Sequence, residues 1–71
     1  MQHIEFKLKG EFIELIQLLK ALDIAQTGGH AKMIVEDEQV FRNGELELRK
    51  RAKLKKQEKI QIGADIMVEI V

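Results

Sequence analysis

The dipeptide Asn43-Gly44 is the feature that most restricts how this chain can fold. A two-residue type I′ turn requires positive φ at both central positions, and Asn followed by Gly meets that requirement best. The segments on either side, residues 40–42 and 45–48, are rich in apolar residues. The sequence therefore predicts a tight β-hairpin around this dipeptide.

Before the hairpin, the apolar periodicity changes once. Residues 4–8 alternate apolar and polar side chains, as in a half-buried strand, and Gly10 ends that pattern. The apolar residues of the next segment recur at helical spacing. We expect a helix over residues 11–22, with Phe12 on its buried face.

A second helix is predicted after a short connection. Thr27 suits the N-cap of a helix that runs to about residue 37. Gly28 and Gly29 directly follow the cap and leave the first free backbone N–H groups of the helix open to close approach. An anion site is one interpretation of these glycines, and close packing of the two helices at a corner is the other.

The C-terminal part predicts a second hairpin. Residues 60–62 and 66–70 alternate around a turn at residues 63–65. The order of one strand, two helices and two hairpins indicates an α+β fold in which two helices pack on a small, mainly antiparallel sheet. With 71 residues, the chain is expected to form a single domain over residues 1–71.

Basic residues are concentrated in one segment, although the formal net charge of the chain is zero. Residues 49–59 hold seven of the twelve Lys and Arg residues and one acid, Glu58. If this segment is extended, its cations and its apolar residues fall on opposite sides. The apolar side is then Leu46, Leu48, Ala52 and Leu54, with Lys50 as an exception, and the cationic side is Arg49, Arg51, Lys53 and Lys55.

A row of cations on an apolar support is suited to a line of phosphates. A solvated charged face is the alternative. Residues 50–59 are also good helix formers, so a short basic helix stays open beside the extended prediction. Arg42 either extends the row or pairs with Glu45 or Glu47 across the hairpin, and Phe41 either stacks on a base or is buried against another element.

The composition argues against catalysis and metal binding. The chain has no Ser, Cys, Tyr or Trp, so no nucleophile with an evident base is present. His3 and His30 lie in different predicted elements, and no metal or other cofactor is expected. The absence of Cys, of a signal-peptide pattern and of a long apolar run favours a cytoplasmic protein that does not span a membrane.

Three segments together resemble a known RNA-binding module. They are residues 27–34 (TGGHAKMI), 40–44 (VFRNG) and 49–54 (RKRAKL). They are similar to the alpha-L RNA-binding motif of small-subunit ribosomal protein S4, and most similar to the small stand-alone bacterial proteins of the YbcJ-like group. The resemblance covers about residues 11–63, and the final strand also fits that group.

The resemblance implies two helices on a small sheet and an RNA-contacting surface built from the second helix and the following hairpin. It implies RNA, in a ribosome or another RNA–protein assembly, as the partner, and a role related to translation. Together with the charge pattern it gives the candidate RNA-binding residues, which are Gly28, Gly29, His30, Lys32, Arg42, Asn43, Gly44, Arg49, Lys50, Arg51, Lys53 and Lys55. The chain is thus expected to bind structured RNA without catalysis, and an adaptor that docks its basic strand on an acidic protein is the alternative.

Overall fold

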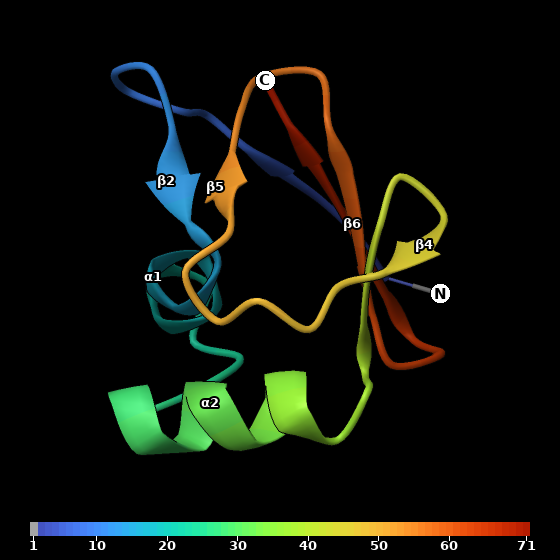
Figure 1. Ribbon diagram of the computed structural model, residues 1–71. Helices are drawn as coiled ribbons and strands as arrows, with labels where there is room; N and C mark the ends of the chain where they lie inside the picture. The colour runs from blue at the N-terminus through green and yellow to red at the C-terminus, as the bar shows by residue number, and fades with distance from the viewer. Residues whose placement is uncertain (1) are drawn as a thin grey trace.

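The computed structural model describes residues 2–71 as a sheet with two helices on one of its faces (Figure 1). The elements in chain order are β1 (Gln2–Phe6), β2 (Ile13–Glu14), α1 (Leu15–Ala21), α2 (Gly28–Glu36), β3 (Val40–Arg42), β4 (Glu45–Leu46), β5 (Lys53–Leu54), β6 (Lys59–Ile62) and β7 (Ile66–Ile70). The α+β fold with two helices on a mainly antiparallel sheet is therefore confirmed.

The main sheet has five strands in the order β1-β7-β6-β3-β4. Its neighbouring strands are antiparallel except β1 and β7, which run parallel with Gln2 opposite Ile66. The two short strands β2 and β5 form a separate antiparallel ladder. The closing hairpin of β6 and β7 has its turn at residues 63–65, as the sequence predicts.

The hairpin of β3 and β4 turns at Asn43 and Gly44, whose φ angles are 51° and 87°. Positive φ at both positions confirms the predicted turn. The turn is also fastened to β6, because the Asn43 N–H donates to the Lys59 carbonyl at 2.8 Å and the Asn43 Oδ1 accepts from the Lys59 N–H at 2.9 Å. The side-chain carbonyl of Asn43 therefore has a structural partner.

This turn fixes a register that sends Leu46 to the side of the sheet opposite the helices. Leu46 pairs with Phe41, and the neighbouring Val40 faces the core with no exposed surface. Alternate residues point to opposite faces, so Phe41 and Leu46 share the outer face. Leu46 and Leu48 are 41% and 55% exposed, whereas Ala52 and Leu54 are buried, so the prediction that these four residues share one apolar side is wrong.

The first helix is shorter than predicted. It begins at Leu15, because Ile13 and Glu14 are extended and pair with β5. Phe12 lies before this strand and is 41% exposed, so its predicted burial on the helix is wrong. The helical spacing of apolar residues extends back to Phe12, but the pairing with β5 makes Ile13 and Glu14 extended, so the helix begins only after them.

The second helix begins where the sequence predicts. The Thr27 Oγ1 accepts a hydrogen bond from the His30 N–H at 3.1 Å, which is the geometry of an N-cap. The helix ends at Glu36, and its Ala31 and Val35 are buried.

Residues 50–59 are neither one extended row nor a helix, so both predictions for this segment are wrong. Lys53 and Leu54 form the short strand β5, with turns on either side of it, and Lys59 already begins β6. Ala52 and Leu54 point into the core, as predicted, and are 4% and 0% exposed. The segment thus bears two apolar anchors between its exposed cations.

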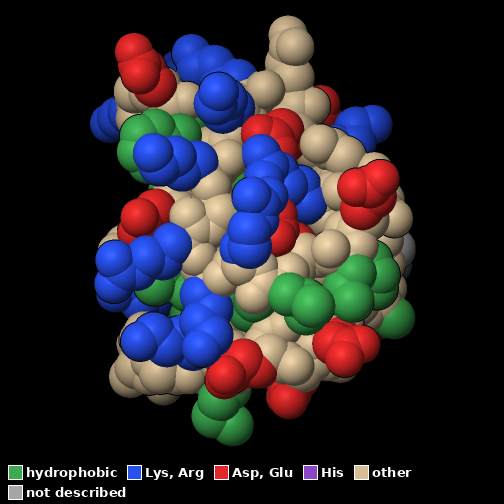
Figure 2. Space-filling model, viewed as in Figure 1, with side chains coloured by type: hydrophobic (Ala, Val, Ile, Leu, Met, Phe, Trp, Pro, Cys, Tyr) green, Lys and Arg blue, Asp and Glu red, His purple; other side chains and the backbone are tan. Residues whose placement is uncertain are grey.

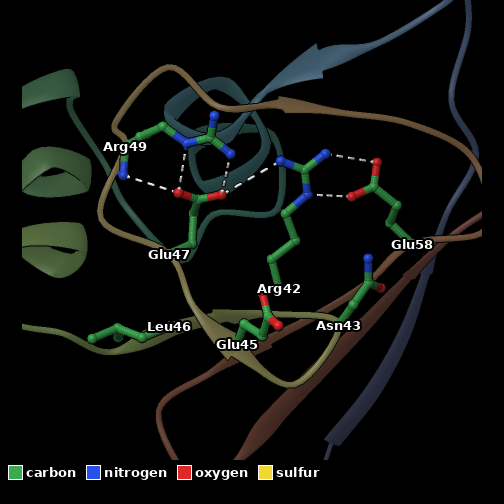
Figure 3. A pocket seen from close by; sticks show the side chains of 7 residues that line it. All are labelled: Arg42, Asn43, Glu45, Leu46, Glu47, Arg49 and Glu58. Atoms are coloured by element: carbon green, nitrogen blue, oxygen red, sulfur yellow. Dashed lines mark hydrogen bonds and ion pairs between the residues drawn. The ribbon is translucent and has the colours of Figure 1, made fainter.

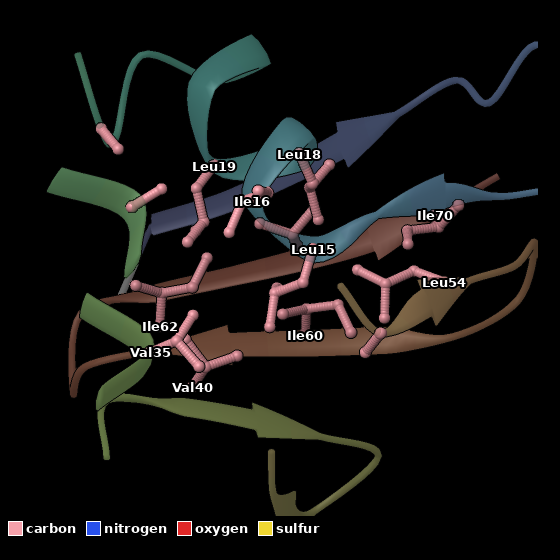
Figure 4. Packing of buried hydrophobic residues seen from close by; sticks show 14 of the residues in the cluster. Leu15, Ile16, Leu18, Leu19, Val35, Val40, Leu54, Ile60, Ile62 and Ile70 are labelled. Carbon is pink, nitrogen blue, oxygen red and sulfur yellow. The ribbon is translucent and has the colours of Figure 1, made fainter. Parts of the chain in front are cut away.

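The core lies between the helices and the inner face of the sheet (Figure 4). Helix α1 contributes most of the helical side chains, and β3, β6 and β7 supply the facing aliphatic residues. Leu54 of the basic segment enters the same cluster. The best buried large side chains are Leu15, Leu18, Leu19, Val35, Val40, Leu54, Ile60, Val68 and Ile70.

Leu54 and Leu48 should therefore differ in their contribution to the free energy of unfolding. We expect Leu54→Ala to lower the free energy of unfolding by about 2–5 kcal/mol, because it opens a cavity in the core. Leu48→Ala, at an exposed position, should change it by no more than about 0.5 kcal/mol. Urea unfolding followed by circular dichroism measures both, and equal losses would contradict the observed register.

Candidate nucleic-acid interface

Five of the predicted site residues surround one open depression, and we call this group the basic surface. It consists of Arg42, Arg49, Arg51, Lys53 and Lys55, with Ala52 also lining the depression. Figure 2 shows the Lys and Arg side chains gathered on this face of the molecule, with acidic side chains between some of them. The end of β3, the turn after β4 and strand β5 bring these residues together.

Arg42 is held by two carboxylates (Figure 3). Its Nε and Nη2 both donate to the carboxylate of Glu58, the latter over 3.0 Å, and its Nη1 donates to the Glu47 Oε1 over 3.4 Å. Its Nη2 also donates to the Lys53 carbonyl over 2.9 Å. The predicted pairing with Glu47 is thus present, the pairing with Glu45 is not, and the main partner is Glu58.

Glu47 is the one buried charged residue in the described part of the chain, with 6% exposure. It points inward because the hairpin register turns Leu46 outward, and its backbone N–H still donates to the Val40 carbonyl at 2.8 Å. Its carboxylate accepts hydrogen bonds from the backbone N–H, Nε and Nη2 of Arg49, each at 3.1 Å. The partners offset the cost of burying this charge.

These contacts shift the pKa values of Arg42, Glu47, Arg49 and Glu58. Hydrogen bonds from Arg49 lower the pKa of Glu47, and those from Arg42 lower the pKa of Glu58, although partial burial opposes both shifts. The pKa of each arginine is raised in return, mainly by its hydrogen bonds to Glu58 for Arg42 and to Glu47 for Arg49. At neutral pH the two arginines therefore face two carboxylates and add little net charge to the basic surface.

The net positive charge of the basic surface comes from its other members. Arg51, Lys53 and Lys55 are exposed and make no ion pair within residues 2–71. Lys50 lies apart from them, because its Nζ pairs with Glu36 at the end of α2 over 3.2 Å. That pair is exposed on both sides and contributes little to stability.

The basic segment is also bonded to the start of α1. The Leu15 N–H donates to the Ala52 carbonyl at 2.9 Å, and the Ile16 N–H donates to the Lys50 carbonyl at 3.2 Å. Helix α1 has no side-chain cap at Glu14, so these carbonyls satisfy backbone N–H groups that a helix start otherwise leaves free. The backbone that carries the cations is therefore hydrogen-bonded both to the start of α1 and to Arg42.

The predicted residues of α2 lie outside the depression. A Cβ added at Gly28 would meet no atom within 4 Å, so corner packing does not account for this glycine. His30 is exposed, and its Nδ1 accepts from the Gln26 N–H at 3.4 Å. Lys32 is exposed on the same helix. Gly29 is exposed as well, with only the Thr27 Oγ1 near its added Cβ.

Asn43, Gly44 and Phe41 line a different depression, on the outer face of the sheet. Phe41 is half-buried there beside its cross-strand neighbours Leu46 and Gln61. It is therefore covered in part by its own sheet and does not pack under another element. Its stacking on a base stays a prediction.

Sequence reasoning missed three residues of this region and one contact of a fourth. Glu58 was not recognised as a partner of Arg42, although it is the only acid among residues 49–59, and Glu47 was considered as a partner of Arg42 but not of Arg49. Phe12 was assigned to the core, and Lys56 was not singled out. Both line a second depression, which shares Lys53 and Lys55 with the basic surface.

Two further features are absent from residues 2–71. No group of three or more His, Asp or Glu side chains could hold a metal ion. No described helix is both long enough and apolar enough to cross a membrane.

The comparison with protein families decides the relationship of this chain. The model of the S4 domain matches residues 6–71. The chain belongs to the S4 domain family. S4 domains are in general RNA-binding and not enzymatic. A comparison with curated proteins found no match.

The match extends beyond residues 11–63, where the sequence resemblance was placed. It includes the whole closing hairpin and reaches into the end of β1. The resemblance to the alpha-L module is therefore confirmed at the level of the S4 domain.

The two anchoring carboxylates give this S4 domain an expected acid sensitivity. Folding lowers the pKa of Glu47 and Glu58, so their stabilising effect is present at neutral pH and is lost as the pH falls through their folded-state pKa values. We expect the free energy of unfolding to decrease below about pH 4.3, the ordinary pKa of glutamate. Urea unfolding at several pH values measures this.

The matched variants are Glu58→Gln and Glu5→Gln. Glu58→Gln should lower stability at pH 7 by about 1–3 kcal/mol, because a charge-assisted hydrogen bond is lost, and should flatten the acid dependence. Glu5 is exposed on β1 and makes no ion pair in the described chain, so its change should do neither. An unchanged acid dependence in Glu58→Gln would contradict the role given to this pair.

Proposed function

We propose that this S4 domain binds structured RNA through the phosphate backbone, without catalysis, and that the basic surface is the main contact. The observation that carries the proposal is the set of three exposed cations without ion pairs, Arg51, Lys53 and Lys55, around one depression. Membership in an RNA-binding family supports it independently.

The two paired arginines have a different part in this proposal. Arg42 and Arg49 already donate to Glu58 and Glu47, so a phosphate would have to compete with a carboxylate for them. We assign Arg42 to holding the Lys53 carbonyl and the turn that carries Lys55. Arg49 is 73% exposed in its side chain and adds a weaker contact at the edge of the depression.

A rigid set of charges favours RNA with defined shape. Contacts to phosphates position a protein on nucleic acid but do not read the bases. A-form stems present phosphates and 2′-hydroxyls at fixed spacing, so cations grouped around one depression on a fixed backbone select them by geometry. We therefore propose a stem or stem-loop as the preferred ligand class.

Helix α2 and the β3–β4 turn supply secondary contacts in this proposal. Lys32 adds charge on α2, and Lys50 contributes only where a phosphate replaces its partner Glu36. His30, Gly28 and Gly29 present the open start of α2 to a phosphate. Asn43 and Gly44 lie at the turn, where the amide NH₂ of Asn43 is the group left for RNA. A bacterial, cytoplasmic RNA–protein assembly such as the ribosome is the setting we propose, and no cofactor is required.

The adaptor alternative has less support from the geometry. Addition of a partner strand needs an open, extended edge. Strand β5 has only two residues, pairs with β2, and uses its Lys53 carbonyl to accept from Arg42. The basic segment therefore offers charges but little free strand edge.

Removing the three unpaired cations should weaken binding to a stem-loop RNA. We expect Arg51→Gln, Lys53→Gln and Lys55→Gln together to lower affinity roughly a hundred- to five-hundredfold near 0.1 M salt, because each lost phosphate contact contributes about 0.7–0.9 of a power of ten there. The slope of log K against log salt should become shallower by about 2–3. Fluorescence anisotropy at several salt concentrations measures both.

A charge-matched control is Lys7→Gln, Lys9→Gln and Lys20→Gln. These lysines are exposed and line neither the basic surface nor the depression at Phe12. Both triple variants lose three positive charges, so a difference between them reflects position. Equal losses of affinity, with both variants folded, would remove the basic surface as the binding site.

The preference for A-form geometry has its own test. A stem-loop RNA should bind more tightly than a DNA of the same sequence at matched salt, because the DNA lacks 2′-hydroxyls and the A-form phosphate spacing. Competition of the two against one labelled RNA measures the ratio. A ratio near one would reduce the protein to a general binder of polyanions.

A further inference from the structure

Phe12 is an exposed aromatic residue at the border of the basic surface. Its side chain stands 41% exposed just before β2, after a bend in which Gly10 has a φ of 99°. The Nζ of Lys53 lies 4.9 Å from the centroid of its ring. Folding has therefore left one of three Phe residues uncovered, beside a cation and away from the core.

The surroundings of Phe12 include three lysines and one acidic residue. An open depression beside the ring is lined also by Gly10, Glu11, Lys53, Lys55, Lys56 and Gln57. Two of these lysines, Lys53 and Lys55, also line the depression of the basic surface. A nucleic acid that lies on the basic surface thus has an aromatic ring within its path.

The lysines on the far side of the ring sit on a turn of fixed shape. The Lys55 N–H donates to the Glu58 Oε2 at 2.7 Å, and the Glu58 N–H donates to the Lys55 carbonyl at 3.3 Å. Gln57 has a φ of 75°, and its N–H donates to the Ile70 carbonyl at 2.6 Å. Because Arg42 holds Glu58 in addition, little further ordering of this turn is needed on binding.

We propose that Phe12 stacks on an unpaired base of the bound RNA, at the end of a stem or in a bulge, while Lys55 and Lys56 contact the phosphates that flank it. This inference rests on the proposed RNA binding and adds a second kind of contact to it. An exposed aromatic ring combined with cations is the combination that holds single-stranded nucleotides. A fully paired stem offers no such base, since its bases stack on one another.

The Lys53 ammonium does not prevent this stacking. An exposed cation–π contact is weaker than the stacking of a base on an aromatic ring, so a base can take its place. Lys53 is then free to reach a phosphate from the same strand. The carboxylate of Glu11 repels phosphates on its side of the depression, which favours a backbone path over Lys55 and Lys56.

The test compares two RNA hairpins that differ by one unpaired 3′ nucleotide, 2-aminopurine. We expect the overhang to raise the affinity of the unchanged protein about five- to a hundredfold. The fluorescence of 2-aminopurine should fall further on binding, because it stacks on the ring. Phe12→Leu should abolish most of this gain while its affinity for the blunt hairpin stays within about twofold.

Two further variants make the result specific to the ring. The chain has no Trp, so Phe12→Trp introduces a single indole, whose emission should be quenched by the overhang RNA and much less by the blunt one. Phe41→Leu changes the half-buried aromatic of the other depression and should keep the full gain. If Phe41→Leu lost the gain and Phe12→Leu kept it, the assignment to Phe12 would be overturned.

The outcomes separate this inference from the proposed function. Equal affinity of the unchanged protein for the two hairpins, without a change in 2-aminopurine fluorescence, overturns the base site and leaves phosphate binding intact. Failure to bind either hairpin at low salt overturns the proposed function, and the base site with it. The fluorescence of the unchanged protein decides the matter even if a variant does not fold.

Discussion

The hydrogen-bonded arrangement around Arg42 is the interaction on which the functional face depends. One guanidinium joins four parts of the chain: the end of β3, Glu47 after β4, the carbonyl of Lys53 in β5 and Glu58 before β6. Strand β5 has only two residues, so the path of the segment between β4 and β6 depends on this guanidinium together with the Lys50 and Ala52 carbonyls bonded to α1 and the buried side chains of Ala52 and Leu54. Charge-assisted contacts thus help to shape the loop that carries the cations.

This arrangement shows why acids belong in a basic binding face. Seven cations packed into residues 49–59 would repel one another and favour an open loop. Glu47 and Glu58 reduce that repulsion where they pair with Arg49 and Arg42. The charges of Arg51, Lys53 and Lys55, which face solvent, have no carboxylate partner in residues 2–71. Whether a cation supports the loop or is free to contact a ligand therefore depends on its position relative to these two carboxylates, more than on the number of charges.

The sequence predicted features that depend on local chemistry, and it failed where tertiary contacts decide. The Asn43-Gly44 turn and the Thr27 cap follow from backbone preferences, and both are present. The direction of Leu46 depends on strand register, which alternation within the segment could not reveal. The exposure of Phe12 depends on pairing between β2 and β5, which are far apart in sequence. The group of cations could be predicted because its clustering in residues 49–59 is visible in the sequence without knowledge of the strand register.

The parallel pairing of β1 with β7 has a consequence for how the domain forms. Gln2 lies beside Ile66, so nearly the whole chain separates these partners. Closing so long a loop costs entropy before any contact compensates for it, which slows folding. During synthesis, β1 cannot pair with β7 until that strand has left the ribosome, whereas the β3–β4 hairpin can close earlier. The nascent chain thus exposes its cationic segment before its sheet is complete, beside a surface made largely of RNA.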